Sequence, residues 1–227
     1  MICTSGTSAC NASLPHVQSL LGTEVLTEQQ IIEAVLKPEG TKDIEKRIKA
    51  AELIKNPELY GSVLESPDFG SEFLFPSAEA QTILRWLGDT MRGSAEAVDE
   101  LRVVMLPSED KKSILTSNVT VVTLNKLTPL FKNIKLKCRR DSAGIMPLPI
   151  KVDTREEFLS SVSGLFAKFD GIIEKKNPDE EIIICSTGGY KAVAGFAMMY
   201  AQLHSIPCLY SFEGSQEAYE VMSVPLG

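Results

Sequence analysis

The residues best suited to chemistry form a short polar segment, Ser186–Lys191, that directly follows the apolar run Glu181–Cys185. Two adjacent glycines let its backbone turn tightly, and an Ala- and Met-rich stretch typical of a helix comes next. Backbone amides at the start of such a helix point outward and bind anions such as phosphate. The residues that we expect to bind a ligand here are Ser186, Thr187, Gly188, Gly189, Tyr190 and Lys191.

The same segment has a plainer interpretation, in which it is a turn and a helix cap with Lys191 in solvent. It is neither a Walker loop nor a G-x-G-x-x-G fingerprint, so it does not specify a nucleotide by itself. Both interpretations stay open on this segment alone.

Two further strand ends carry polar residues. The apolar strand Met1–Ser5 runs into a hydroxyl-rich turn, and Pro107 after the run Leu101–Leu106 is followed by a serine and acidic residues. Small hydroxyl residues suit anion binding, although they also make good turns. Three polar strand ends together predict one ligand crevice. The further residues that we expect to bind a ligand there are Ser5, Gly6, Thr7, Ser8, Asn11, Ser108 and Glu109.

An obvious general base is missing from these three segments. No histidine or pair of carboxylates near them provides such a base, so ordinary acid–base hydrolysis is not indicated.

The elements that must position these residues alternate between strand and helix. Apolar strands that alternate with amphipathic helices predict an α/β fold, Rossmann-like, with a mainly parallel sheet flanked by helices. One segment, Ser117–Leu124, is equally compatible with a helix or a strand. The predicted strands are Met1–Ser5, Leu101–Leu106, Ile134–Cys138, Pro149–Val152, Glu181–Cys185, Pro207–Phe212 and Tyr219–Val224. The predicted helices lie within Thr27–Lys55, interrupted at Pro38–Gly40, and within Ser77–Leu87, Lys112–Leu130, Asp153–Lys176 and Lys191–His204.

The overall composition excludes several classes of protein. A net charge of -7 over 227 residues argues against a protein that coats duplex DNA, because such a surface must be basic. The five cysteines show no CxxC pair and there are two histidines, so we expect buried thiols and no metal site. The sequence contains no apolar run of membrane-helix length and no signal peptide. We therefore expect a cytoplasmic protein with no membrane partner.

Taken together, the segments resemble a known family. The first strand end, Cys3–Ser8 with Asn11, is a T-x-G-T-S-like turn, and Thr187–Ala192 matches T-G-G-[FY]-K. The closing segments Tyr210–Glu213 and Val224–Leu226 are also similar. These features resemble the CRISPR-associated Rossmann fold, or CARF, family, the sensor domains of type III CRISPR defence.

The resemblance implies a single CARF domain over residues 1–227 that forms a homodimer. Residues 24–70 are the least typical, which predicts a helical insertion there, and an effector domain can follow residue 227 in the natural protein. The implied ligand is a cyclic oligoadenylate, with four adenylates favoured over six, bound where the carboxyl edges of two sheets face each other. No cofactor is implied. Lys191 would neutralise charge, and Thr7, Ser8 and Thr187 would hydrogen-bond phosphate or ribose.

Two functions follow from the resemblance. In the first, the protein is a sensor whose ligand allosterically activates an effector. In the second, it is a stand-alone ring nuclease that cleaves the messenger without a metal, since the ribose 2′-OH attacks the neighbouring phosphate and the protein only aligns it and stabilises charge. The catalytic candidates would then be Ser5 or Ser8, with Lys191. A third class, another Rossmann-like nucleotide-binding enzyme, is disfavoured because the first strand lacks the G-x-G-x-x-G turn.

Overall fold

A parallel sheet forms the centre of the molecule. The computed structural model describes residues 1–6, 20–21, 26–35, 43–60, 72–93, 99–127, 130–131, 134–151, 153–189, 191–211 and 219–221. Its strands are β1 (Ile2–Ser5), β2 (Glu100–Pro107), β3 (Lys135–Cys138), β4 (Ile184–Cys185), β5 (Cys208–Tyr210) and β6 (Tyr219–Val221). They follow the order β3-β2-β1-β4-β5-β6. The first five are parallel, and β6 pairs with β5 in the antiparallel sense.

Strand β1 lies in the middle of this order, paired with β2 on one side and β4 on the other. From β1 the chain builds β2 and β3 on one side and then crosses to build β4 and β5 on the other. The order therefore reverses between β1 and β4. Open α/β sheets bind ligands at such a reversal, beyond the carboxyl ends of the strands.

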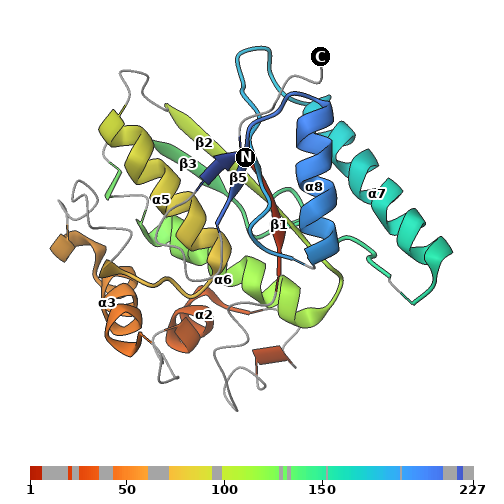
Figure 1. Cartoon of the computed structure of the whole chain (residues 1–227). Coiled ribbons are helices and arrows are strands. Elements are labelled where there is room, and N and C mark those ends of the chain that lie inside the picture. The colour runs from red at the N-terminus through yellow and green to blue at the C-terminus, as the bar shows by residue number, and fades with distance from the viewer. Residues whose placement is uncertain are drawn as a thin grey trace.

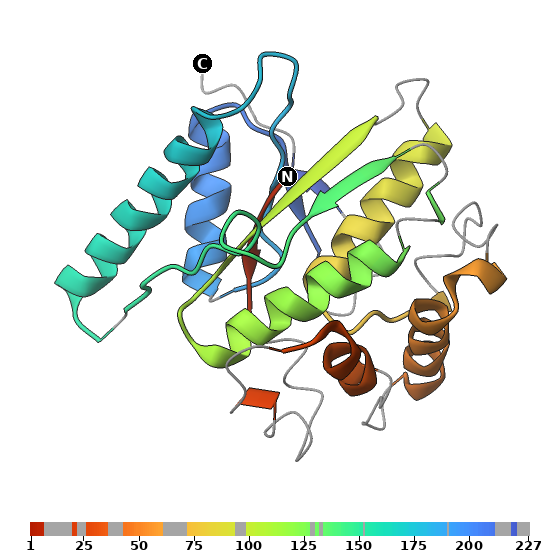
Figure 2. The same ribbon diagram turned by 180° about the vertical axis from the view of Figure 1, so that it is seen from behind.

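Helices cover both faces of the sheet. They are α2 (Glu28–Val35), α3 (Ile44–Lys55), α5 (Ala78–Gly93), α6 (Lys111–Leu127), α7 (Arg155–Ile173) and α8 (Lys191–Leu203), with a 3-10 turn at Pro57–Tyr60. Helices α5 and α6 cover one face, and α7 and α8 cover the other (Figures 1 and 2). Because successive strand residues point to opposite faces, Cys3 belongs to the core under α5 and α6, and Ile2 to the core under α7 and α8.

The region predicted as a helical insertion is packed onto this framework. Ile31 and Ile32 of α2 are buried against Leu115, Val119 and Val122 of α6. Leu53 and Ile54 of α3 are fully buried in the core beneath α5. The described helices of residues 24–70 therefore extend the α5/α6 side of the molecule.

Most predicted elements are confirmed, and the open one is settled. Ser117–Leu124 lies wholly inside helix α6. Within it, Thr120 Oγ1 donates to the Thr116 carbonyl at 2.9 Å, so this hydroxyl is satisfied by the preceding helical turn. The predicted strand Glu181–Cys185 narrows to a two-residue ladder, β4, although Ile2 N–H still donates to the Ile183 carbonyl at 2.8 Å.

The predicted strand at Pro149–Val152 is wrong for its described residues, 149–151. These residues form no ladder, and the chain just before them pairs with β2 through isolated bridges, Met105 with Ile145 and Ser108 with Leu148. The physical reason is that Pro147 and Pro149 flank Leu148 and lack the N–H groups that a ladder needs.

No helix in the part of the chain that the structure describes combines the length and apolar character needed to cross a membrane.

Candidate ligand site at the carboxyl edge of the sheet

The strongest sequence candidate forms a tight turn between β4 and α8. We call its described residues, Ser186–Gly189, the glycine turn. Gly189 has φ of 103°, a left-handed conformation that favours glycine. Helix α8 begins at Lys191, whose side chain is exposed. The α8 N-terminus and one cation therefore lie together at the edge where the strand order reverses.

The end of β1 and the residue after it, Thr4, Ser5 and Gly6, are here called the β1 turn, which contacts the glycine turn directly. Thr4 Oγ1 donates a hydrogen bond to the Gly188 carbonyl at 2.6 Å. A Cβ on residue 6 would lie 2.6 Å from the Gly189 nitrogen, so glycine at position 6 permits the close approach of the two backbones. Segments from the two ends of the sequence thus form one unit.

Ser5 is the sequence candidate with the most distinctive environment. Its residue is 3% exposed, and its Oγ is buried without a hydrogen-bond partner among the groups that the structure describes. Its carbonyl accepts a bond from Ser113 Oγ at 2.9 Å. Buried hydroxyls normally have a partner, so an unsatisfied one is a candidate contact for a ligand or water.

The third polar strand end is joined to the β1 turn through helix α6. The Oγ of Ser113 on α6 also accepts the Ser108 N–H at 3.2 Å. Asp110 caps α6, accepting the N–H groups of Lys112 and Ser113 at 3.0 Å. Glu109 is exposed, and its N–H donates to the Leu148 carbonyl.

The hydroxyls of the glycine turn are used for internal contacts. Ser186 is fully buried, and its Oγ lies 3.3 Å from Cys208 Sγ on β5. Thr187 Oγ1 accepts the Ser211 N–H at 3.1 Å and a bond from Thr82 Oγ1 of α5 at 3.0 Å. These two side chains hold the turn in place. Four further candidates, Thr7, Ser8, Asn11 and Tyr190, lie outside the described residues.

Sequence reasoning missed one residue of this site, Glu79 in the first turn of α5. Its side chain is fully buried, and its Oε1 accepts the Gly6 N–H at 2.8 Å. A Cβ on residue 188 would lie 1.8 Å from that same oxygen. Glu79 is remote from Gly6 in sequence, but it precedes the buried Ile83 by four positions, so its place on the buried side of α5 was a usable signal.

The cysteines beneath the site do not offer a reactive thiol. Burial raises the pKa of Cys3 well above its ordinary value, and that of Cys208 to about 11. Cys3 donates a hydrogen bond to its strand neighbour Cys185, which lowers the pKa of Cys185 despite burial. All three side chains are buried, and none is accessible to a substrate.

The arrangement suits binding of an anion beside a hydrogen-bonding group. Lys191, Lys111 and Lys112 are exposed cations in the first turns of α8 and α6, both of which begin at the carboxyl edge. Helix N-termini attract negative charge, and lysine adds a mobile ammonium.

A family model described as "CRISPR-associated protein (Cas_APE2256)" matches residues 76–226. The matched segment begins just before α5 and includes the glycine turn and α8, whereas β1 and the β1 turn precede it. No curated protein matches the chain.

Proposed function

The chain belongs to the CRISPR-associated protein family Cas_APE2256, and from this premise we propose that it is a CARF domain that binds a cyclic oligoadenylate at the carboxyl edge of its sheet. The observation that carries the proposal is the contact between the β1 turn and the glycine turn, marked by the 2.6 Å bond from Thr4 to Gly188. These are the two segments that resemble the ligand motifs of the CARF family.

The chemistry of the edge fits a phosphodiester ring. The α8 N-terminus and Lys191 supply positive charge for phosphate, and Ser5 Oγ, which has no partner among the described groups, would supply a hydrogen bond once ring binding uncovers it. A homodimer would present each of these groups twice around a two-fold axis, matching the repeated adenylates of a ring. In the sensor function, the ring stabilises one arrangement of the dimer and so activates an effector allosterically.

A second function, metal-independent ring cleavage, is favoured by the Ser5 environment. In that reaction the 2′-oxygen of a ribose bonds to the adjacent phosphorus and the bond to the 5′-oxygen breaks. The 2′-OH proton ends on the departing 5′-oxygen, so a 2′,3′-cyclic phosphate and a 5′-OH are produced without a co-reactant. Ser5 and Lys191 would stabilise the charge on the phosphorane oxygens.

The test is equilibrium binding of labelled cyclic tetra-adenylate and hexa-adenylate in a chelator, followed by product analysis. We expect binding of at least one ring, and a loss of roughly 10- to 100-fold in Lys191→Ala, since a hydrogen bond to a charged group contributes about 1.5–3 kcal/mol. The matched control is Lys135→Ala at the start of β3, an exposed lysine in another part of the sheet. Linear products that require Lys191 would establish the nuclease, and binding of neither ring would refute the proposal.

A further inference from the structure

Glu79 is a buried charged residue that the proposed function leaves unexplained. Its side chain is fully buried in the first turn of α5, a helix capped by Ser77, whose Oγ accepts the Ala80 N–H at 3.0 Å. Burying a carboxylate is costly unless hydrogen bonds and a favourable field offset the lost hydration. The N-terminus of α5 supplies the field, and the Gly6 N–H supplies one hydrogen bond.

The position of Glu79 links both turns of the site at once. It bonds to Gly6 of the β1 turn at 2.8 Å. It also covers Gly188 so closely that a Cβ there would lie 1.8 Å from Oε1 and 2.5 Å from Cδ, so a side chain at position 188 would displace the Glu79 carboxylate. The absence of a side chain at position 188 is therefore explained by packing against Glu79 as well as by the turn itself.

Helix α5 makes a second contact of the same kind, three residues further along. Thr82 Oγ1 bonds to Thr187 Oγ1 at 3.0 Å. Residues three apart lie on one side of a helix, so Glu79 and Thr82 present one surface to the two turns. Ser77 anchors the start of this helix to α6 through Thr120, with the two hydroxyl oxygens 2.7 Å apart.

We propose that Glu79 is the positioning residue of the ligand site, which fixes the β1 turn against the glycine turn by holding the Gly6 amide and packing over Gly188. This role rests on the proposed function, because the site that Glu79 organises is the one assigned to the cyclic oligoadenylate. Fully buried behind the two backbones, Glu79 acts through them and does not touch the ligand. A preorganised pair of turns binds more tightly because less backbone freedom is lost on association.

The test compares Glu79→Ala, Glu79→Gln and the control Glu156→Ala, which removes an exposed acidic residue from the first turn of α7. Amide hydrogen exchange at Gly6 is measured without ligand, and binding of cyclic tetra-adenylate is measured separately. In Glu79→Ala we expect Gly6 to exchange at least about tenfold faster and the ring to bind at least about tenfold more weakly, the effect of roughly one hydrogen bond. Glu79→Gln keeps the length and a carbonyl acceptor, so both values should return to within about threefold of wild type.

Different results refute different claims. If Glu79→Ala is less stable but its folded form keeps wild-type exchange at Gly6 and wild-type ring affinity, Glu79 has only a structural role and the inference is wrong. If Glu79→Gln behaves like Glu79→Ala, the acceptor is not what matters, which also overturns it. If Glu79→Ala does not fold, slow exchange of the Gly6 amide in wild type and in Glu79→Gln supports the positioning role of Glu79. Fast exchange of this amide in wild type refutes that role. If wild type binds no ring, the proposed function fails, while the exchange rates at Gly6 still test whether Glu79 positions the β1 turn.

Discussion

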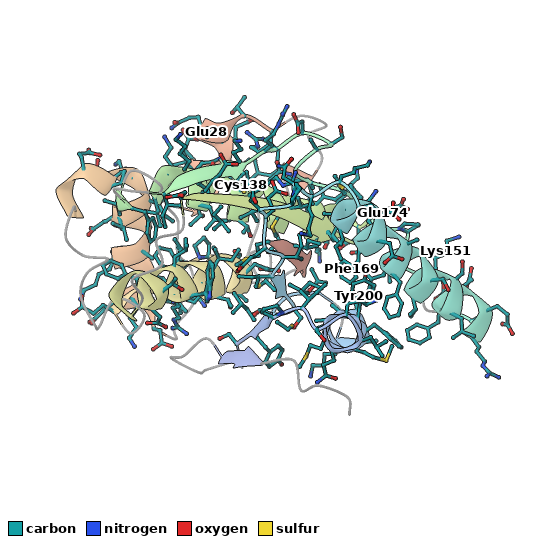
Figure 3. The ribbon with its side chains drawn as sticks, turned by 90° about the horizontal axis from the view of Figure 1, so that it is seen from above. Glu28, Cys138, Lys151, Phe169, Glu174 and Tyr200 are labelled. Carbon is teal, nitrogen blue, oxygen red and sulfur yellow. The ribbon has the colours of Figure 1, made fainter. Side chains whose placement is uncertain are left out.

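The side chains buried on the two faces of the sheet differ in polarity. Beneath α5 and α6, hydroxyls and a carboxylate are buried among the apolar residues, including Thr82, Glu79, Ser113, Thr116 and Thr120. Beneath α7 and α8, aromatic and aliphatic side chains dominate: Phe169 packs on Tyr200 with ring centroids 4.8 Å apart (Figure 3). Both helix layers pack against the same sheet, so the difference in polarity reflects the different role of each layer.

The polar face contacts the proposed ligand site through several side chains, whereas the apolar face contacts it at the start of α8. Side chains of α5 and α6 bond to the β1 turn and the glycine turn through Glu79, Thr82 and Ser113. Among the residues that the structure describes, the α7/α8 face contributes to the site where α8 begins, at Lys191. Substitutions on the polar face should therefore alter ligand binding, whereas equivalent changes on α7 should alter stability alone.

The largest effect is expected from filling the space at Gly188. In Gly188→Ala the new methyl group collides with the Glu79 carboxylate, and overpacking of this kind destabilises by roughly 1–3 kcal/mol. Because the turns must separate, ring affinity should also fall by at least about tenfold. The matched change on the other face is Gly164→Ala in α7, where a Cβ meets nothing within 4 Å.

For Gly164→Ala we expect a gain of roughly 0.5–1 kcal/mol from helix propensity, with unchanged ring affinity. Urea denaturation and a binding titration on both variants measure the contrast. Equal ring affinity in the two variants would contradict the distinction between the faces.

An intermediate effect is expected from the helix caps, of which each face offers one. Ser77 caps α5, and Thr154 caps α7 by accepting the Glu157 N–H at 3.2 Å. Replacing either by alanine should cost about 1 kcal/mol, more for the buried Ser77, which also loses its contact with Thr120. Only Ser77→Ala should weaken ring binding, by about threefold or more, because α5 carries Glu79. A matching loss of affinity in Thr154→Ala would show that general stability, not the polar face, governs binding.

The smallest effect is expected on the apolar face, at the Tyr200 hydroxyl. It donates to Asp170 Oδ1 at 2.5 Å, and burial together with this bond raises the pKa of Tyr200. Tyr200→Phe should cost about 1 kcal/mol near neutral pH without changing ring affinity.

The alkaline dependence of that effect has a definite sign. An acid whose folded-state pKa is raised stabilises the fold below its unfolded pKa, about 10 for tyrosine, and loses that contribution as pH rises through the folded value. The difference in unfolding free energy between wild type and Tyr200→Phe should therefore shrink above about pH 10. A difference that grows with alkalinity, measured by urea denaturation, would exclude the raised pKa.

The sequence was sufficient for much of the fold because apolar periodicity is a local signal. Continuous apolar runs predicted β1, β2 and β5, and the repeat of Phe158, Leu165 and Phe169 predicted α7. The prediction failed at Pro149–Val152, where two apolar residues after a proline, Ile150 and Val152, were interpreted as a strand. Ser117–Leu124 was ambiguous because threonine and valine favour strands intrinsically. In the structure, the segment is a helix whose side chains are mostly buried.

Part of the candidate site was predictable because it also depends on local sequence pattern. Strand-end turns at Ser5–Gly6 and Ser186–Gly189 follow from local pattern, and parallel topology brings them to one edge. Three facts depend on tertiary contacts and carry no local signature: the burial of Ser5 Oγ, the use of the Ser186 and Thr187 hydroxyls within the fold, and the bond from Gly6 to Glu79.

The central claim is that a cyclic oligoadenylate binds across the β1 turn and the glycine turn. Its most direct test is amide hydrogen exchange of the wild-type protein with and without saturating cyclic tetra-adenylate, repeated with the hexa-adenylate. We predict slowed exchange at Ser5–Gly6, Ser186–Gly189 and the first turn of α8, and unchanged exchange along α7. Slowing confined to other segments, or no change with either ring, would contradict the account.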